Sequence, residues 1–335
     1  MKVLFDHPDP FFLAHGGVQT QIEQSKAALQ KLGVEVEFVR WWDGQQYGEL
    51  IHYFGRPTGT YICLARQKQL KVIMTNLLGG LGARSGSMRL AQWGATRLAR
   101  VILPREFTAR LAWDAFKKAD ACIALTGWEA HLMKRIFSAP REKVHVIPNG
   151  VEEVFLQSTP AKRGPWLVCT ATITPVKRVV ELAQAAAAAD TQIWVIGKPY
   201  SETDPYARAF LQLARRHSQV IRYEGPIYDR AKLAQVYRES RGFVLLSRWE
   251  TLSLSALEAA ACACPILVSD RPWARSVFGE RAVYCPLATT TVTARVLRQF
   301  YEDAPNLIPP PPPRSWQQVA EELKAVYSGV LGNSW

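Results

Sequence analysis

The feature that most constrains the fold is an alternation of short apolar runs with helical patterns, which runs through the chain twice. The apolar runs predict buried strands, and apolar residues at helical spacing predict the helices between them. The strands predicted in the first half are Val3–Phe5, Glu35–Arg40, Leu50–Phe54, Lys71–Thr75, Ala121–Leu125 and Val144–Ile147. Those predicted in the second half are Trp166–Thr170, Gln192–Ile196, Val220–Tyr223, Gly242–Leu246, Pro265–Val268 and Ala282–Tyr284. Such alternation is typical of parallel α/β layers.

Breaks in this alternation of strands and helices indicate two domains. The first alternation ends at the turn signal Pro148-Asn149-Gly150. The segment 158–165 is polar and rich in helix- and strand-breaking residues, and we expect it to be the interdomain linker. We therefore expect a first domain over 1–155 and a second over 156–308. A stiff run, Pro309–Pro313, then leads to a last amphipathic helix at about Ser315–Tyr327, within 314–335. Two doubly wound domains facing a cleft would suit a reaction of two substrates.

Composition narrows the class of protein. The net charge of +12 indicates an anionic partner: nucleic acid, an anionic membrane or a phosphorylated small molecule. The six scattered cysteines form no CxxC pair, which predicts small buried side chains in a reducing cytoplasm and no metal site. The sequence has no run of about 18 apolar residues, so no membrane span is predicted. A dinucleotide-dependent dehydrogenase is disfavoured, because no Gly-x-Gly-x-x-Gly opens either half.

The most specific segment lies between 247 and 270. A buried strand ends at about Leu246, and a short loop leads to a helix that should begin near Ser253. Free N–H groups at a helix start suit an anionic phosphate. Glu258, just over one turn into that helix, could accept hydrogen bonds from ribose hydroxyls. Glu250 lies in the loop before the helix. Read one residue at a time, the same pattern also fits a cap and a solvated glutamate.

The whole string resembles the signature of family 4 of the retaining glycosyltransferases. It consists of Glu250-x7-Glu258, an alanine-rich helix, Pro265 and an apolar strand that ends in Ser-Asp. The resemblance extends over nearly the entire chain. Further segments that resemble the family are Gly16–Ile22, Leu50–His52, Ala119–Thr126, Val146–Val151 and Ser315-Trp316. These enzymes have the GT-B fold: two Rossmann-like domains facing a cleft, with a C-terminal helix that crosses back onto the first domain.

The resemblance implies a donor site in the second half. Glu258 would hold the ribose of a nucleoside-diphosphate sugar, and Glu250 would contact the sugar ring. The backbone of Thr251, Leu252 and Ser253 would hold the phosphates. This sequence has Thr-Leu-Ser there, where the family usually shows Gly-Phe-Gly.

A second part of the donor site is expected after strand Trp166–Thr170. The family commonly shows Gly-Arg-Leu and then Lys-Gly, whose two cations clamp the diphosphate. Lys177 fits the lysine. The arginine position falls on Ala171 or Thr172, so that charge is missing, and Arg178 occupies the usual glycine position, from which it could substitute.

The first half contributes four further candidates. Gly16 and Gly17 match the glycines that let the backbone approach the donor diphosphate. His15 beside them is a candidate for substrate contact. Asn76 stands near the place where family members often carry a histidine that contacts the donor sugar. His52 lies within the predicted strand Leu50–Phe54 and is expected to be a packed structural group.

The expected reaction is transfer of a sugar to an acceptor hydroxyl on a glycan, a glycolipid or a small-molecule glycoside, with Lys177 and Glu250 as catalytic residues. No cofactor and no metal are expected, because Lys177 and a helix N-terminus could stabilise the leaving diphosphate and no Asp-x-Asp is present to hold a metal. Two alternatives of the same fold stay open. One is a sugar-nucleotide 2-epimerase, and the other is a sugar-nucleotide-binding protein that has lost activity.

A basic stretch over Arg84–Lys118 has eight Lys or Arg against one Glu and one Asp, with Trp93 and Trp113 interleaved. Such a segment could dock on an anionic membrane and bring a lipid-linked acceptor to the enzyme, at the inner face of a membrane. It could equally be a core-packed helix pair with a solvated basic face. No base-reading motif accompanies the charges, so nucleic acid is not an expected partner.

Overall fold

The computed structural model describes residues 1–9, 11, 16–82, 84–102, 112–159 and 161–332. The chain divides into two compact units, of which the first contains 1–149 together with 316–335 and the second contains 150–315. Each unit is built on a six-stranded parallel sheet. None of the helices in the described part of the chain is long and apolar enough to cross a membrane.

The first unit has the strand order β2-β1-β3-β4-β5-β6, with every neighbouring pair parallel. Its strands are β1 (Lys2–Asp6), β2 (Glu35–Phe38), β3 (Leu50–Phe54), β4 (Lys71–Thr75), β5 (Ala121–Ala124) and β6 (Val144–Val146). Its helices are α1 (Gly17–Lys31), α2 (Gly59–Gln67), α3 (Gly79–Gly82), α4 (Gly86–Ile102), α6 (Ala115–Lys118), α7 (Gly127–Arg135), the 3-10 helix η2 (Arg141–Lys143) and α15 (Trp316–Leu331). All residues of β3 and β5 are buried, because helices cover both faces of the sheet.

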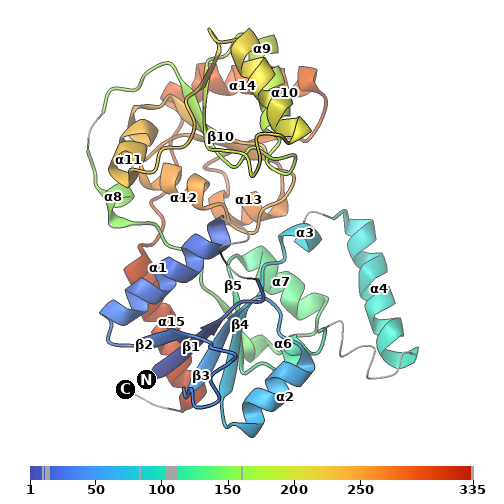
Figure 1. Ribbon diagram of the computed structural model, residues 1–335. Coiled ribbons are helices and arrows are strands. Elements are labelled where there is room, and N and C mark those ends of the chain that lie inside the picture. The colour runs from blue at the N-terminus through green and yellow to red at the C-terminus, as the bar shows by residue number, and fades with distance from the viewer. Residues whose placement is uncertain (10, 12–15, 83, 103–111, 160, 333–335) are drawn as a thin grey trace. The chain divides into compact units, whose positions relative to one another are not determined.

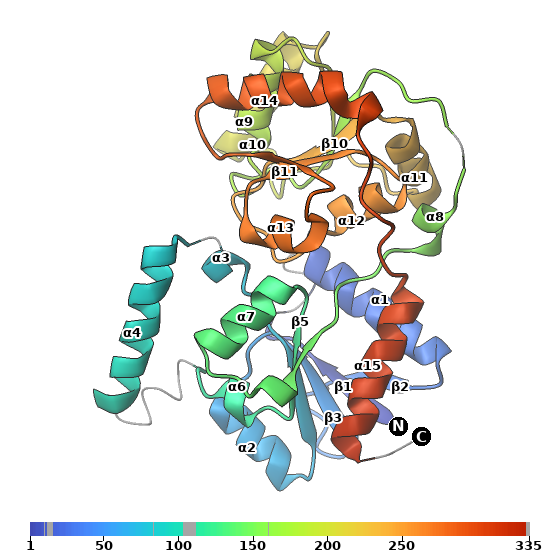
Figure 2. The ribbon, with the colours of Figure 1, turned by 180° about the vertical axis from the view of Figure 1, so that it is seen from behind.

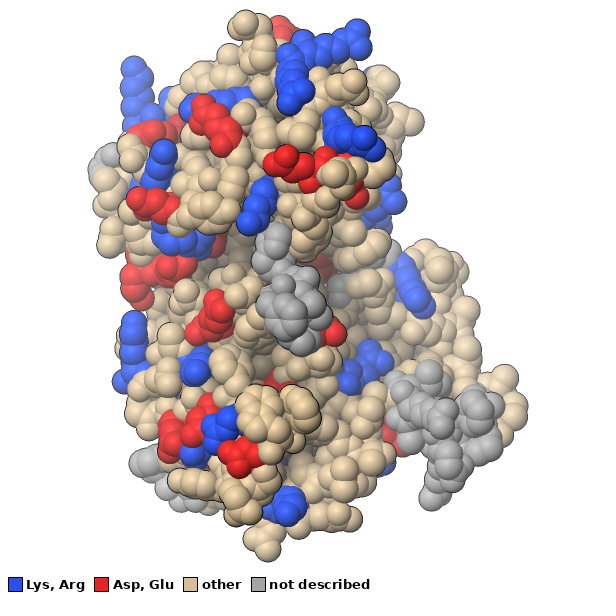
Figure 3. All heavy atoms as spheres, in the orientation of Figure 1, with Lys and Arg blue, Asp and Glu red and all other residues tan. Residues whose placement is uncertain are grey.

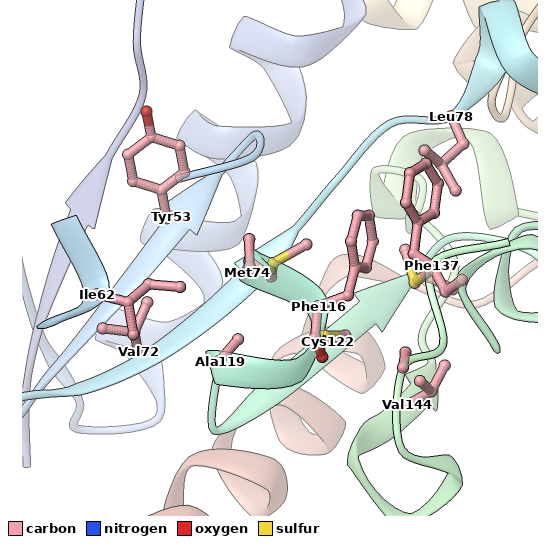
Figure 4. Close-up of a cluster of buried hydrophobic side chains, with 14 of the residues drawn as sticks. Tyr53, Ile62, Val72, Met74, Leu78, Phe116, Ala119, Cys122, Phe137 and Val144 are labelled. Atoms are coloured by element: carbon pink, nitrogen blue, oxygen red, sulfur yellow. Dashed lines mark hydrogen bonds between the residues drawn. The ribbon is translucent and has the colours of Figure 1, made fainter. Parts of the chain in front are cut away.

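One core of the first unit lies between the sheet and the helices α2, α6 and α7. In this core Phe116 of α6 stacks on Phe137 with ring centroids 4.3 Å apart, and Met74 of β4 lies close by (Figure 4). The carboxylate of Glu129 on α7 accepts the backbone N–H groups of Leu78 and Leu125, at 2.6 and 3.0 Å. It thereby joins the segments that follow β4 and β5. Burial raises the pKa of Glu129 to about 7.

The C-terminal helix α15 completes the other face of this sheet, where it packs on α1 (Figures 1 and 2). The buried imidazole of His52 on β3 fixes it. One ring nitrogen lies 2.6 Å from the hydroxyl of Tyr327 on α15, and the other lies 2.7 Å from the hydroxyl of Thr75 on β4. Burial lowers the pKa of His52 to about 3, so the ring is neutral. His52, at the middle of β3, is therefore a structural group, as the sequence predicts.

The second unit has the strand order β12-β11-β10-β7-β8-β9, again all parallel. Its strands are β7 (Leu167–Thr170), β8 (Ile193–Ile196), β9 (Ile221–Tyr223), β10 (Gly242–Leu245), β11 (Ile266–Ser269) and β12 (Val283–Cys285). Its helices are α8 (Glu153–Leu156), α9 (Val179–Ala188), α10 (Pro205–Arg216), α11 (Arg230–Glu239), α12 (Leu254–Ala261), α13 (Pro272–Phe278), α14 (Thr290–Asp303) and the 3-10 helix η3 (Ala304–Asn306). Counted from β7, this is the order 3-2-1-4-5-6 of the classic dinucleotide-binding fold.

The unit boundary differs from the expected one. Residues 150–155 belong to the second unit, where Val151 pairs with Ser315 and the buried ring of Phe155 packs on Tyr237. The expected linker, 158–165, also lies within this unit. Its Arg163 donates hydrogen bonds of 2.7 Å to the carbonyls of Ser240 and Ala263. Arg163 thus fixes this breaker-rich segment to the surface of the second unit, so the segment is not a linker between the units.

Candidate functional site: the strand-order reversal of the second unit

The strand order of the second unit reverses between β7 and β10, which are neighbours in the sheet although β8 and β9 lie between them in sequence. The loops that follow these two strands leave the same edge of the sheet and lead into α9 and α12. Open parallel sheets bind ligands at this kind of point, beyond the carboxyl ends of the strands. The candidate donor residues of the second half all follow β7 or β10.

Lys177 and Glu250 meet across these two loops. The ammonium group of Lys177, in the loop after β7, forms an ion pair with the carboxylate of Glu250, in the loop after β10. The backbone of the two loops is joined as well, because the N–H of Arg248 donates to the carbonyl of Val176 at 2.7 Å. The structure thus brings the two residues of the predicted catalytic pair into contact.

Arg178 is the N-cap residue of α9 and adopts a left-handed backbone conformation, with φ of 54°. This conformation favours glycine, which is the residue that the resemblance places there. The guanidinium is buried and lies 3.4 Å from the carboxylate of Glu181, while its Nη1 atom makes no hydrogen bond. The Nη1 atom of Arg178, the residue that follows Lys177, is therefore a buried donor atom without a hydrogen-bond partner.

Glu181 gathers several partners around this loop. Its carboxylate accepts a 2.6 Å hydrogen bond from the hydroxyl of Tyr206 and lies 3.5 Å from the guanidinium of Arg248. Burial acts to raise the pKa of Glu181, but the Tyr206 hydrogen bond and the charge of Arg178 outweigh it and lower that pKa. The ionised Glu181 holds Arg178 and Arg248 at the start of α9. Thr172, half buried, lies earlier in the same loop and brings no charge.

Helix α12 begins as the sequence predicts. The hydroxyl of Ser253, its N-cap residue, accepts the backbone N–H of Ala256 at 3.3 Å. Leu252 is buried and anchors the loop, and Thr251 is half buried. Side-chain capping satisfies one of the N–H groups at this helix start and leaves others for an anion.

Glu258 is buried on α12 and carries two contacts with α11. Its Oε1 atom pairs with the guanidinium of Arg230, and its Oε2 atom accepts a 3.3 Å hydrogen bond from the hydroxyl of Tyr237. Arg230 also donates from Nε to Glu152 at 2.7 Å. Burial raises the pKa of Glu258, and the charge of Arg230 opposes that rise. A carboxylate offers about four acceptor positions, so Glu258 keeps capacity for ribose hydroxyls.

Sequence reasoning missed the partners of these site residues. Arg230 reaches Glu258 from 28 positions earlier in the chain, and no spacing rule links the two. Glu181 and Tyr206 are likewise separated by a strand and its loops. The one available signal is general: a glutamate predicted inside a buried helix needs a cation or hydrogen-bond donors.

The remaining candidates lie in the first unit. Gly16 is the N-cap residue of α1 with an extended backbone, and Gly17 is the first helical residue. A Cβ atom at Gly16 would meet no atom of the described residues within 4 Å, so these residues do not require glycine there. Asn76 directly follows β4; it is buried, and its Nδ2 atom makes no hydrogen bond. His15 lies outside the described residues.

Known proteins resemble this chain in sequence over part of its length and in fold over nearly all of it. Residues 164–303 match the family model of glycosyl transferases group 1. The chain is 29% identical to a D-inositol 3-phosphate glycosyltransferase of Jonesia denitrificans over 182 residues, which are 46% of this chain and 42% of that protein. It is 31% identical to the protein of the same name in Kribbella flavida over 172 residues, 45% of this chain and 40% of that one. The chain therefore spans less than half of the length of these relatives.

Solved structures show the same fold at low identity. Sucrose-phosphate synthase from Thermosynechococcus elongatus matches over all of both chains with a TM-score of 0.72 and 16% identity. Anabaena HepE in complex with UDP matches over 98% of this chain and 100% of that one, with a TM-score of 0.67 and 14% identity. The α/β fold expected from the alternating pattern is thus confirmed as the GT-B fold, and residues 164–303 match the model of the glycosyl transferases group 1 family.

Proposed function

We propose that this protein transfers a sugar from a nucleoside-diphosphate sugar to an acceptor hydroxyl, with retention of configuration and without a divalent metal. The observation that carries the proposal is the meeting of Lys177 and Glu250 at the strand-order reversal of the second unit. Both residues lie in the stretch 164–303 that matches the model of glycosyl transferases group 1, which supports the proposal. Solved structures of the same fold include HepE with UDP and with UDP-glucose.

The arrangement assigns a role to each part of the site. Glu258 accepts hydrogen bonds from the ribose, and the backbone of residues 251–253 at the start of α12 binds the phosphates. Lys177 exchanges the carboxylate of Glu250 for the diphosphate when the donor binds. Glu250, released from the ion pair, then accepts hydrogen bonds from hydroxyls of the donor sugar. The ion pair keeps both side chains in place in the free protein until the donor replaces the contact between them.

Bond breaking explains the need for positive charge. The bond between the anomeric carbon and the diphosphate oxygen breaks, and its electron pair stays on the diphosphate. The acceptor oxygen forms the new bond on the same face of the sugar, and its proton passes to the departing phosphate. Lys177 and the free N–H groups of α12 stabilise the charge that develops, which is the role a metal would otherwise have. A chelator should therefore leave the transfer rate unchanged. A loss of rate that Mg²⁺ restores would refute this part of the proposal.

Calorimetry tests the donor site directly. Wild-type protein should bind at least one of UDP, GDP and ADP, and Glu258→Ala should weaken that binding by about tenfold or more, because ribose contacts are lost. Glu239→Gln is the matched control, since Glu239 is exposed at the end of α11. Equal affinities for wild type and Glu258→Ala, with both proteins folded, would remove Glu258 from the site.

Kinetics test the role of Lys177. The diphosphate is already negative in the bound donor, but bond cleavage adds charge, so part of the Lys177 interaction exists only in the transition state. We expect Lys177→Ala to lower kcat by about 100- to 1000-fold and donor affinity by a smaller factor. If affinity collapses while kcat at saturating donor stays near the wild-type value, Lys177 is only a binding residue. Release of a 2-epimer of the donor sugar would instead indicate an epimerase.

A further inference from the structure

Helix α4 in the first unit has an uncovered apolar face. Five large apolar side chains of this helix are more than half exposed: Met88 (57%), Leu90 (63%), Leu98 (60%), Val101 (84%) and Ile102 (67%). At 100° per residue they fall within one half of the helix, together with Ala91, Gly94 and Ala95. We name these eight residues the α4 face. No charged residue interrupts it.

The other side of α4 contacts the protein. Thr96 is buried, and the guanidinium of Arg89 lies 4.8 Å from the ring centroid of Trp128 on α7. Arg97 covers the ring of Trp93 at 4.3 Å. Both views show α4 standing apart from the sheet of its unit (Figures 1 and 2). The α4 face is thus the side turned away from the contacts that hold the helix.

The charged residues within α4 and at the two positions before it are all arginines. Between positions 84 and 102 the sequence has four arginines and no acidic residue. In the space-filling view the surface over α4 is mostly uncharged, with scattered blue side chains (Figure 3). An apolar helix face on a helix whose own charged residues are all arginines matches the boundary between anionic lipid headgroups and acyl chains. A protein partner would need acidic and apolar groups placed to match this helix. A membrane offers anionic headgroups and acyl chains at every point of its surface.

The rest of the basic stretch does not extend this face. Trp113 packs against the hydrophobic core of the first unit. Lys117 and Lys118 belong to α6, and Lys118 lies 4.0 Å from the carboxylate of Asp114. Residues 103–111, with Arg105 and Arg110, lie outside the described part of the chain. The structure therefore limits the membrane-docking surface, which the sequence predicts over the 35 residues Arg84–Lys118, to helix α4.

We propose that the α4 face docks on an anionic lipid surface, with the helix lying along the interface. Leu90, Leu98 and Val101 enter the acyl boundary, and Arg97 stays at the level of the phosphates. Docking requires no nucleotide and does not rest on the proposed transfer reaction. If both proposals hold, the natural acceptor is a lipid-borne hydroxyl.

Sedimentation with vesicles tests the docking. Wild-type protein should sediment with mixed phosphatidylglycerol and phosphatidylcholine vesicles at low salt and less so at high salt, because salt screens the arginines. It should not sediment with phosphatidylcholine alone. Leu98→Glu should reduce the partition coefficient by about tenfold or more, because a carboxylate would enter the acyl boundary. Arg97→Gln should reduce it less and should flatten the salt dependence.

Matched controls use helix α2 of the same unit. Leu64 on α2 is 57% exposed, so Leu64→Glu introduces the same charge change away from the α4 face. Lys68→Gln at the end of α2 removes one positive charge in the same way. Neither control should change vesicle binding. Nucleotide affinity in solution should be the same for all four variants, which keeps this test separate from the proposed reaction.

Three outcomes would overturn the proposal. The first is no binding to anionic vesicles at low salt, and the second is equal loss of binding in Leu64→Glu and Leu98→Glu. The third is a change in self-association: if Leu98→Glu converts a dimer to a monomer and no vesicle binding is seen, the α4 face is a contact between copies of this chain.

Discussion

The charge of Arg230 favours the ionised form of the Glu258 carboxylate. A carboxylate as buried as that of Glu258 tends to bind a proton, and burial does raise its pKa. The nearby carboxylate of Glu152 acts in the same direction. The opposing groups are the guanidinium of Arg230 and the hydroxyl of Tyr237, both from α11. Arg230 is therefore a positioning residue for the predicted ribose ligand.

We expect Arg230→Gln to make nucleoside-diphosphate binding depend on pH near neutrality. Without the guanidinium the pKa of Glu258 rises further, so the carboxylate of the variant binds a proton at a higher pH than that of wild type, and an acceptor is lost as the pH falls. The dissociation constant of the variant should then increase as pH falls, by at most about tenfold per pH unit for one proton. Wild type should vary less, and calorimetry across this pH range measures the difference.

Arg238→Gln is the control for this prediction. Arg238 lies on the same helix and donates to the carbonyl of Val154, but it has no ion pair with Glu258. Its replacement should leave the pH profile of binding as in wild type. A uniform loss of affinity in Arg230→Gln at every pH would mean that Arg230 acts only through the fold or contacts the ligand itself.

At the scale of elements, the loops after β7 and β8 approach each other so closely that only glycine fits. Gly197, directly after β8, has φ of +149°, and a Cβ atom there would lie 2.0 Å from the carbonyl oxygen of Ala171. The N–H of Ile173 donates to the carbonyl of Lys198 at 3.2 Å between the same loops. The shape of the loop that leads to Lys177 therefore depends on Gly197.

Gly197→Ala should destabilise the protein by about 2–5 kcal/mol, from backbone strain and overlap with Ala171. Urea unfolding measures the change. Gly329→Ala is the matched control, because Gly329 is exposed in helix α15 and a Cβ there meets nothing within 4 Å. That change should be neutral or stabilise by up to about 1 kcal/mol. Similar effects of both substitutions would contradict the close approach.

The hydrogen bond between His52 and Tyr327 joins α15 to the sheet. The contribution of His52 to the free energy of unfolding should depend on pH. The pKa of His52 is about 3 in the folded protein, below the 6.5 that is usual for a histidine, so between these two pH values the unfolded state binds more protons. The contribution of His52 to stability is complete above pH 6.5 and falls by about 1.4 kcal/mol per pH unit below it. We expect His52→Gln to cost about 1–3 kcal/mol at pH 7.

The cost of His52→Gln should be smaller by about 2 kcal/mol at pH 5, where unfolded wild type is protonated. Glu129 acts in the opposite direction, because its raised pKa favours the folded state as pH falls from about 7. Both proteins contain Glu129, so its effect cancels when wild type and variant are compared at each pH. A cost that stays constant from pH 7 to pH 5 would mean that His52 is not buried neutral.

At the scale of the whole molecule, one unit is continuous in sequence and the other is not. Residues 150–315 should fold alone, because they contain their whole sheet and its helices. Residues 1–149 alone should not unfold cooperatively, because they lack α15 and expose the face of α1 that packs on it. Joining 149 to 316 through a few glycine and serine residues should restore folding, and calorimetric melting of the three proteins measures this.

The sequence predicts the architecture well because parallel strands are buried on both faces. Leu50–Phe54 and Lys71–Thr75 have the predicted bounds, and the other strands differ by one or two residues at their ends. The interdomain boundary could not be predicted, since it depends on Val151 pairing with Ser315 across the chain. The partners of Lys177 and Glu258 depend on tertiary contacts in the same way. The αL backbone of Arg178 follows only from the resemblance, since residue type alone disfavours it there.

The discontinuous first unit has a consequence for synthesis. Translation at about 5–20 residues per second completes residues 150–315 roughly 10–30 s after residue 149 has been added. Throughout that time the strands of the first unit exist without α15, so the hydroxyl of Tyr327 cannot reach His52. The later unit can then reach its final structure before the earlier one. A nascent chain of this protein therefore exposes the unfinished apolar face of α1 to chaperones until its last helix has left the ribosome.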